Sequence, residues 1–258
     1  MTRVSQAIKN LLLAALPGGE YERLSSEMEF VALPLGARLY HSGDVIEHVY
    51  FPSDALVSVA TRMRDGANVE AGLIGRDGMV GVPVLLGDGI EFEEAVVQIA
   101  GGAMRMRYGA LKEELRHDGS PLLTQLLLYS RDLMRQVAQT ADCNRRHKVE
   151  KRLARWLLMC RDRTESDELP LTQDFISDTL GARRAGLSAA ATTLREEGFI
   201  RYSRGHVAIL NRKGLEEFAC GCYRASREVR ENERTETRQQ KRETLPRQTP
   251  GRNHSEEA

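Results

Sequence analysis

Cysteine is scarce in this chain and unevenly placed. The 258 residues include only Cys143, Cys160, Cys220 and Cys222, so none lies in the first half. Four scattered thiols exclude a disulfide-rich secreted scaffold, and we expect reduced cysteines at surface or half-buried positions. Cys220 and Cys222 are the only close pair, and their spacing is not that of a zinc or iron–sulfur motif. The sequence therefore predicts no metal site and no cofactor, although a redox role for this pair stays open.

Long hydrophobic runs are also missing. The run at residues 11–16 is far shorter than the roughly 20 apolar residues that a membrane helix needs. It also lacks the length and the cleavage site of a signal peptide. We therefore expect a cytoplasmic protein with no membrane partner.

Net charge is absent from the chain as a whole but not from its parts. Lys and Arg number 37, as do Asp and Glu. Residues 1–118 hold 11 basic and 17 acidic side chains, whereas residues 145–213 hold 15 basic and 9 acidic ones. This asymmetry suggests that only the C-terminal part faces nucleic acid.

Residues 171–210 carry the strongest local pattern. Thr172 is a good N-cap after a proline, and Gly181 is suited to end the first helix. A second helix follows with a single apolar stripe at the i, i+3, i+4 and i+7 positions, and Gly198 stops it. Two short β-prone runs then surround the turn Ser203-Arg204-Gly205. This order predicts a winged helix-turn-helix, which places its second helix in the DNA major groove.

The preceding residues divide into a β-rich region and a helical one. Short β-prone runs separated by glycine turns fill residues 20–107, as in a β-sandwich or barrel. From Pro121 apolar residues recur at three- and four-residue steps over about five turns, a stripe wide enough for both a β-domain and a partner helix. We expect a dimer interface formed by Leu126, Tyr129, Leu133 and Val137, with burial of this helix inside its own chain as the alternative.

The order of these parts resembles the Crp/Fnr family of bacterial transcription regulators. The resemblance covers residues 20–220 and rests on the joint order of motifs such as Gly75-Arg76-Asp77-Gly78-Met79-Val80-Gly81 and Leu194-Arg195-Glu196-Glu197-Gly198-Phe199-Ile200. It implies an α+β fold with a cyclic-nucleotide-binding-type β-roll (a jelly roll), a long dimerisation helix and a C-terminal winged helix-turn-helix. The expected parts are an N-terminal helix at 1–19, the β-roll at 20–118, the dimerisation helix at 119–144, the DNA-binding domain at 145–223 and a disordered charged tail at 224–258.

The ligand motif of the family is not preserved. Cyclic-nucleotide binders of the family have Gly-Glu and, about ten residues later, Arg followed by Ser or Thr and Ala. Here Val82 replaces the ribose-binding glutamate and Glu93 introduces negative charge where the phosphate would sit, so the resemblance implies a degenerate pocket formed by Gly81, Val82, Glu93, Glu94 and Ala95. The cysteine group of iron–sulfur relatives is absent too. We expect the β-roll to sense an unknown signal other than cyclic AMP, or to serve only as a scaffold.

The expected DNA contacts follow from the second helix and its surroundings. Arg184 can reach guanine with both ends of its guanidinium, and Ser188 and Thr192 share its side of the helix. Contacts to phosphates are expected from seven basic or partly basic side chains, namely Arg145, Arg146, Lys148, Arg183, Arg201, Arg204 and His206.

Three functions remain in competition at this point. The favoured one is a homodimeric regulator that binds inverted repeats in double-stranded DNA and acts with RNA polymerase. The alternative is a β-roll dimer scaffold or interaction protein with a vestigial winged helix. An enzyme is least favoured, because no metal-spaced cluster and no nucleophile with a base partner stands out in the sequence.

Overall fold

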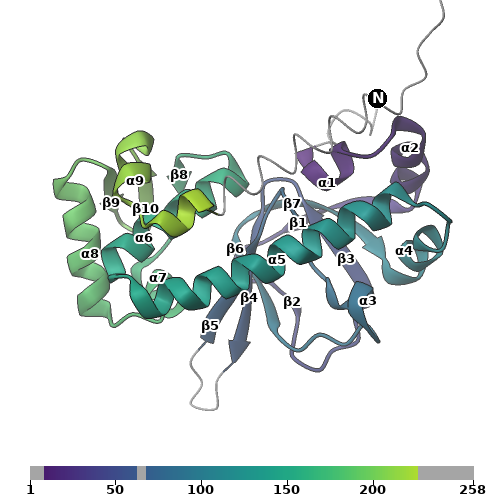
Figure 1. The fold of residues 1–258 in the computed structure, drawn as a ribbon, viewed down its shortest axis with the longest axis horizontal. Coiled ribbons are helices and arrows are strands. Elements are labelled where there is room, and N and C mark those ends of the chain that lie inside the picture. The colour runs from purple at the N-terminus through teal and green to yellow at the C-terminus, as the bar shows by residue number, and fades with distance from the viewer. Residues whose placement is uncertain (1–8, 63–67, 226–258) are drawn as a thin grey trace, which may run out of the picture.

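The protein has an antiparallel β-roll, a long helix and a C-terminal helical domain with a small sheet (Figure 1). This is a computed structural model, and it describes residues 9–62 and 68–225. The expected α+β fold is confirmed. Residues 1–8 of the expected N-terminal helix and nearly all of the expected charged tail at 224–258 lie outside the described residues.

The β-roll is built from two antiparallel sheets. The first has the order β1 (Met28–Leu33), β7 (Gly101–Arg107), β3 (His48–Pro52). The second has the order β2 (Arg38–Tyr40), β6 (Glu94–Ile99), β4 (Leu56–Arg62), β5 (Asn68–Ile74). Alternate side chains of β3 and β6, such as Phe51 and Val97, are fully buried in the same core. The period of two arises because successive side chains of a strand point to opposite faces of the sheet.

Short helices cover the ends of the roll. They are α1 (Leu11–Ala14), α2 (Gly18–Ser26), α3 (Pro83–Leu86) and α4 (Tyr108–Leu115). The expected boundary between the N-terminal helix at 1–19 and the β-rich region from residue 20 falls inside α2, so it does not separate two elements. Pro17 is instead the N-cap of α2, which buries Tyr21 and Leu24 on the roll. Proline is tolerated at a helix start because the first backbone N–H groups have no intrahelical acceptor.

The long helix α5 (Pro121–Arg146) begins at Ser120, whose Oγ accepts a hydrogen bond from Leu123 N at 3.2 Å. It crosses the β-roll and ends beside the C-terminal domain (Figure 1). Leu126 has no exposed surface, and Tyr129 and Leu133 pack against the same core. The assignment of Leu126 to a dimer interface is therefore wrong, and the main contacts of Tyr129 and Leu133 lie within their own chain.

A different side of α5 is exposed. Leu127 is 48% and Met134 58% exposed, and Val137 lies at the edge of this surface at 38%. Ala138 and Ala141 continue it toward the C-terminal end of the helix. The steps of seven, four and three residues between Leu127, Met134, Ala138 and Ala141 form one stripe along the helix.

The C-terminal domain packs around α6 (Val149–Thr164). Its other elements are β8 (Glu168–Leu169), α7 (Gln173–Leu180), α8 (Arg184–Glu196), β9 (Ile200–Ser203), β10 (His206–Ile209) and α9 (Arg212–Phe218). The strands form a sheet of order β8-β10-β9. Buried Trp156, Leu157 and Leu194 share a core with Leu56 and Leu73 of the β-roll, so the two domains pack directly on each other.

Glycines allow this junction to be close. A Cβ atom on Gly75 would lie 2.5 Å from Cβ of Arg163 in α6, and one on Gly78 would clash with the hydroxyl of Tyr129 in α5. Arg163 is buried, lies 3.3 Å from Asp77 through Nε, and donates a hydrogen bond to Gln136 of α5. Gln136 in turn donates to the carbonyl of Leu73 at 3.1 Å. The turn at residues 75–81 therefore contacts both long helices.

All four cysteines are buried, contrary to the expectation of surface or half-buried thiols. The elements β8 and α9 were not predicted either, because they are too short to produce a clear period. None of the helices in the described part of the chain combines the length and the hydrophobicity that a bilayer crossing requires.

Candidate nucleic-acid interface

Helices α7 and α8 are set by local signals. The Oγ1 of Thr172 accepts a hydrogen bond from Phe175 N at 3.3 Å, which confirms the predicted N-cap of α7. Gly181 ends α7 in the left-handed region with φ of 55°, where a side chain would cost energy. Leu187, Ala190, Ala191 and Leu194 are the buried residues of α8, as the predicted stripe requires.

The opposite side of α8 is exposed and made of small residues. Ala185, Gly186, Ser188 and Ala189 are exposed, and Thr192 is partly so. Such a surface lets a backbone approach a groove closely and leaves few long side chains to read bases. Arg184, the first residue of α8, is the long exception, and its side chain is 77% exposed.

Arg184 has a partner on the preceding helix. Its Nη2 lies 2.9 Å from Oδ1 of Asp174 on α7, and both side chains are largely exposed. An exposed ion pair of this kind contributes little to stability, typically less than about 1 kcal/mol. The pair holds the guanidinium at the N-terminal end of α8, and contact with a base edge would have to compete with the carboxylate.

The wing is a two-residue hairpin. Ser203 pairs with His206, which leaves Arg204 and Gly205 as the turn, and both have positive φ, of 47° and 79°. Two positive φ values are typical of a type I′ turn, which suits the twist of a tight hairpin. Asn and Gly are preferred there, so an arginine at the tip is costly for the backbone and exposes its side chain.

The other expected phosphate contacts lie at three places. Arg183 precedes α8, and Arg145, Arg146 and Lys148 lie where α5 ends and α6 begins. All four are exposed, as are Arg201 and His206 on the wing strands. Two of them already have acidic neighbours, because Arg146 lies 2.7 Å from Asp142 and Arg201 lies 3.2 Å from Glu168.

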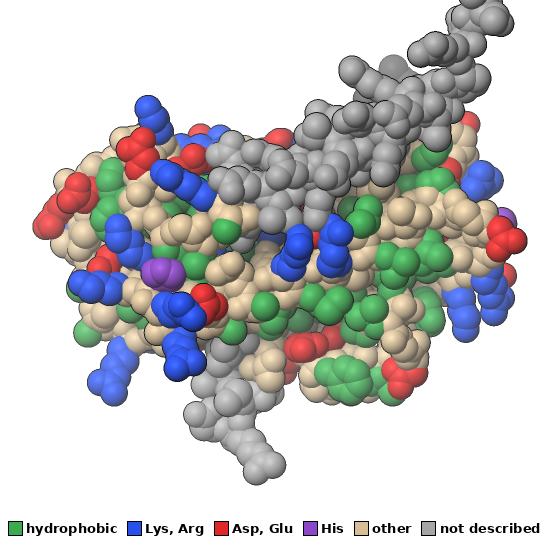
Figure 2. Space-filling model, in the orientation of Figure 1, with side chains coloured by type: hydrophobic (Ala, Val, Ile, Leu, Met, Phe, Trp, Pro, Cys, Tyr) green, Lys and Arg blue, Asp and Glu red, His purple; other side chains and the backbone are tan. Residues whose placement is uncertain are grey.

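Figure 2 shows one face of the molecule. Lys and Arg side chains, with acidic side chains among them, surround the end formed by the C-terminal domain, and further Lys and Arg side chains lie near the middle and at the β-roll end. Hydrophobic side chains gather along α5 and over the adjoining β-roll. A hydrogen bond joins the wing to the segment before α7, because the hydroxyl of Tyr202 in β9 donates to the carbonyl of Leu171 at 3.4 Å. Burial raises the pKa of Tyr202 to about 12, so this hydroxyl remains a donor at neutral pH.

Comparison with known families identifies this domain. Residues 151–218 match the Crp-like helix-turn-helix domain. No curated protein sequence matches the chain.

Solved structures match over most of the chain and show that its fold is that of Crp/Fnr regulators. FixK2 from Bradyrhizobium japonicum is 16% identical, with a TM-score of 0.62 over 75% of this chain and 98% of its own. A CRP-family transcriptional regulator from Thermus thermophilus is 20% identical, with a TM-score of 0.60 over 74% and 96%. The c-di-GMP-responsive global regulator CLP from Xanthomonas campestris is 16% identical, with a TM-score of 0.60 over 76% and 100%.

The expected ligand motif lies in a tightly packed part of the β-roll. A Cβ atom on Gly81 would lie 2.9 Å from the hydroxyl of Tyr40 and 3.1 Å from Val49, so these side chains already fill the space beside this glycine. Val82 and Ala95 are buried, Glu93 is half-buried, and buried Glu94 lies 4.0 Å from Arg38.

The turn before β6 is rich in carboxylates. Buried Glu91 accepts hydrogen bonds from the backbone of Phe92 and Glu93 at 3.1 and 3.3 Å, and burial raises its pKa to about 7. A cyclic phosphate is an anion, and this carboxylate-rich turn supplies no cation to pair with it.

Proposed function

We propose that the protein is a sequence-specific DNA-binding transcription regulator that acts as a homodimer on inverted repeats in double-stranded DNA. The observation that carries this proposal is the exposed side of α8, where Arg184, Ser188 and Thr192 stand opposite a fully buried stripe. In this proposal Arg184 contacts guanine, and Ser188 and Thr192 contact bases near it. Because few other side chains on α8 can read bases, DNA shape supplies much of the specificity.

The phosphate contacts in this proposal come from both sides of α8. They comprise Arg183 beside Arg184, the wing residues Arg201, Arg204 and His206, and the junction residues Arg145, Arg146 and Lys148. Contacts of this kind fix the register on DNA and make the affinity depend on salt.

The proposed dimer interface is the exposed stripe of α5. Leu127 and Met134 expose large apolar side chains at heptad spacing, with Val137 beside them. Pairing this stripe with its symmetry mate forms a two-stranded seam and places two copies of α8 on successive half-sites, about one helical turn apart.

The β-roll would sense a signal other than a cyclic nucleotide, and RNA polymerase would be the further protein partner. The packed space beside Gly81 and the carboxylates of the turn before β6 support the first of these statements. The polymerase assignment rests on the likeness of the fold to transcription regulators.

The experiment that tests the proposal is selection of bound DNA from a random pool by the purified full-length chain. We expect an enriched inverted repeat and an affinity that falls steeply as salt rises. Failure to enrich any sequence, together with salt-independent binding, would favour an interaction protein with a vestigial winged helix.

A further inference from the structure

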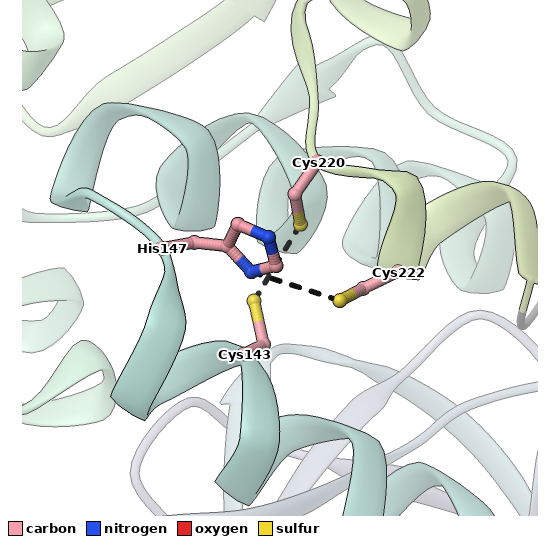
Figure 3. Close-up of side chains that lie close together, drawn as sticks. All are labelled: Cys143, His147, Cys220 and Cys222. Carbon is pink, nitrogen blue, oxygen red and sulfur yellow. Dashed lines mark hydrogen bonds between the residues drawn. The ribbon is translucent and has the colours of Figure 1, made fainter.

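Three cysteines and one histidine meet where α5 ends and the C-terminal segment returns. Cys143 is in the last turn of α5 and His147 is its C-cap, while Cys220 and Cys222 follow α9. The Sγ atoms of Cys143 and Cys220 are 3.5 Å apart, and Sγ of Cys222 is 3.7 Å from Nδ1 of His147. The four side chains point toward one another from two separate segments, as Figure 3 shows. All four donor atoms lie within 4.8 Å of one another.

The surroundings of this cluster hold a positive charge without a full set of partners. Arg155 of α6 is 4% exposed, and its charge acts on both Cys143 and Cys222. Its Nη2 donates to Thr140 at 3.2 Å, but its buried Nε atom has no hydrogen-bond partner among the residues that the structure describes. Burying a cation is costly unless negative charge lies close to it, so three neutral thiols would be poor neighbours for Arg155.

We propose that Cys143, His147, Cys220 and Cys222 bind one divalent cation of the zinc type in a closed tetrahedral site. Three thiolates and one neutral imidazole are a common ligand set for structural zinc. Binding would release the three thiol protons, and the resulting centre would carry a net charge of −1. The guanidinium of Arg155 would balance that charge. Gln139 would stabilise the thiolate of Cys222, because its Nε2 donates a hydrogen bond to Sγ of Cys222 at 3.0 Å.

The distances favour one ion over a cluster. Zinc–sulfur bonds of about 2.3 Å in a tetrahedron place two sulfur ligands about 3.8 Å apart. The Cys143–Cys220 sulfur separation of 3.5 Å lies close to that value, and all four donor atoms lie within 4.8 Å of one another. An iron–sulfur cluster spreads its thiolates over several iron atoms, so at least some of its ligands stand further apart.

The site would join parts of the chain that are distant in sequence. Cys143 and His147 belong to the junction between α5 and α6, and Cys220 and Cys222 begin the last described segment. A metal here would therefore fix the C-terminal segment to the base of the DNA-binding domain. Because four protein ligands leave no open position, its role would be structural.

The first test needs no variant. The reduced full-length chain, stripped of metal by a chelator, is titrated with Co²⁺ and then with Zn²⁺. We expect one Co²⁺ per chain, with the strong visible bands of tetrahedral Co²⁺, thiolate charge-transfer bands in the near ultraviolet, and displacement by one equivalent of Zn²⁺. A reduced, folded chain that binds no Co²⁺ and no Zn²⁺ would overturn the proposal.

Matched variants then locate the ligands. We expect Cys222→Ser and His147→Gln to weaken Zn²⁺ binding by at least the roughly 100-fold that loss of an outer partner can cost. Cys160→Ala is the control, because Cys160 is equally buried but does not belong to the cluster. Zn²⁺ should raise the melting temperature of the control and leave that of Cys222→Ser unchanged. Equal affinities in all three variants would contradict the ligand assignment.

The same thiols could instead form a disulfide, and the experiment separates the two outcomes. Mass spectrometry of the purified chain without reductant would reveal a Cys143–Cys220 bond. If that bond forms and the reduced chain binds neither Co²⁺ nor Zn²⁺, the proposal of a metal site is overturned and the two cysteines are a redox pair. This test also stands apart from DNA binding, because metal stoichiometry is measured without DNA.

Discussion

The indole Nε1 of Trp156 donates a hydrogen bond of 3.0 Å to Oε1 of Glu70, joining the DNA-binding domain to the β-roll. Glu70 lies in β5 and Trp156 in α6, and both are buried. Within the described part of the chain, the second carboxyl oxygen of Glu70 has no hydrogen-bond partner. Burial raises the pKa of Glu70 to about 8, against the opposing effects of Trp156, Arg163 and Arg155.

This shift predicts a pH-dependent stability. The folded protein keeps the proton on Glu70 up to about pH 8, whereas the unfolded chain releases it near 4.5. Folded protein thus binds more protons between these values, and stability falls as pH rises through this window, in total on the order of a few kcal/mol. Urea denaturation at pH 5.5 and 8 should show the decline in wild type and a smaller one in Glu70→Gln, which keeps an acceptor for the indole. Glu113→Gln, at an exposed carboxylate, is the control. An equal decline in both variants would exclude Glu70 as the source.

Arg184 and Arg204 should fail in different ways when replaced. Arg184→Ala is expected to flatten base preference at one symmetric position, at a cost of roughly 1–3 kcal/mol. Arg204→Asn should weaken all sequences alike and reduce the salt slope by about one. Asparagine is chosen because it tolerates the positive φ of the wing tip, so loss of folding cannot account for the result. Selection of bound DNA at several salt concentrations measures base preference and salt slope for each variant. If Arg204→Asn changed the base preference and Arg184→Ala did not, α8 would not be the helix that recognises the bases.

Asp174 should restrain DNA binding through Arg184. Asp174→Asn removes the carboxylate 2.9 Å from the guanidinium, and we expect DNA affinity to rise by about two- to fivefold, the range of an exposed ion pair. Asp178→Asn removes the same charge from α7, where no ion pair with Arg184 is formed. Fluorescence anisotropy with the selected site compares them. Equal gains would mean that only the overall charge of α7 matters.

Met134 should be central to self-association. Met134→Glu places a charge in the middle of the exposed stripe of α5, and we expect a monomer with little operator binding. Met134→Leu keeps the apolar surface and should remain dimeric. Analytical ultracentrifugation of both variants gives the answer, and a dimeric Met134→Glu protein would place the interface elsewhere.

Cyclic nucleotides should not bind the β-roll. Tyr40 and Val49 fill the space beside Gly81, and the family resemblance aligns Glu93 with the position of a phosphate-binding cation. We expect isothermal calorimetry to record no heat of binding for cyclic AMP or cyclic GMP at physiological concentrations. Micromolar affinity for either one would show that the pocket can open.

The winged helix-turn-helix was predictable because its signals are local. Thr172, Gly181 and Gly198 mark helix ends within a few residues of one another, and the stripe from Leu187 to Leu194 has a single period. The helix ends depend on backbone capping, and the buried side of α8 depends on one apolar stripe. Contacts with other domains do not alter either of them.

The orientation of α5 and the cysteine cluster could not be obtained in this way. Two sides of α5 carry apolar residues, and their spacing does not say which side packs against the β-roll. In the structure Leu126 is buried and Leu127 is exposed. Cys143 and Cys220 are 77 residues apart and are brought together only by tertiary packing. No spacing rule covers such a contact, because it depends on how α9 returns to the end of α5.

The glycines at positions 75 and 78 have a mechanical consequence. With no side chain between them, the turn of the β-roll touches Arg163 of α6 and Tyr129 of α5 directly. The contacts are made with Cβ and the backbone oxygen of Arg163 and with the ring and hydroxyl of Tyr129, so a displacement of that turn would press on both helices. A conformational change in the β-roll would therefore be transmitted to the DNA-binding domain as a displacement of the packed helices α5 and α6. The helices would slide at their packed surfaces instead of bending at a hinge.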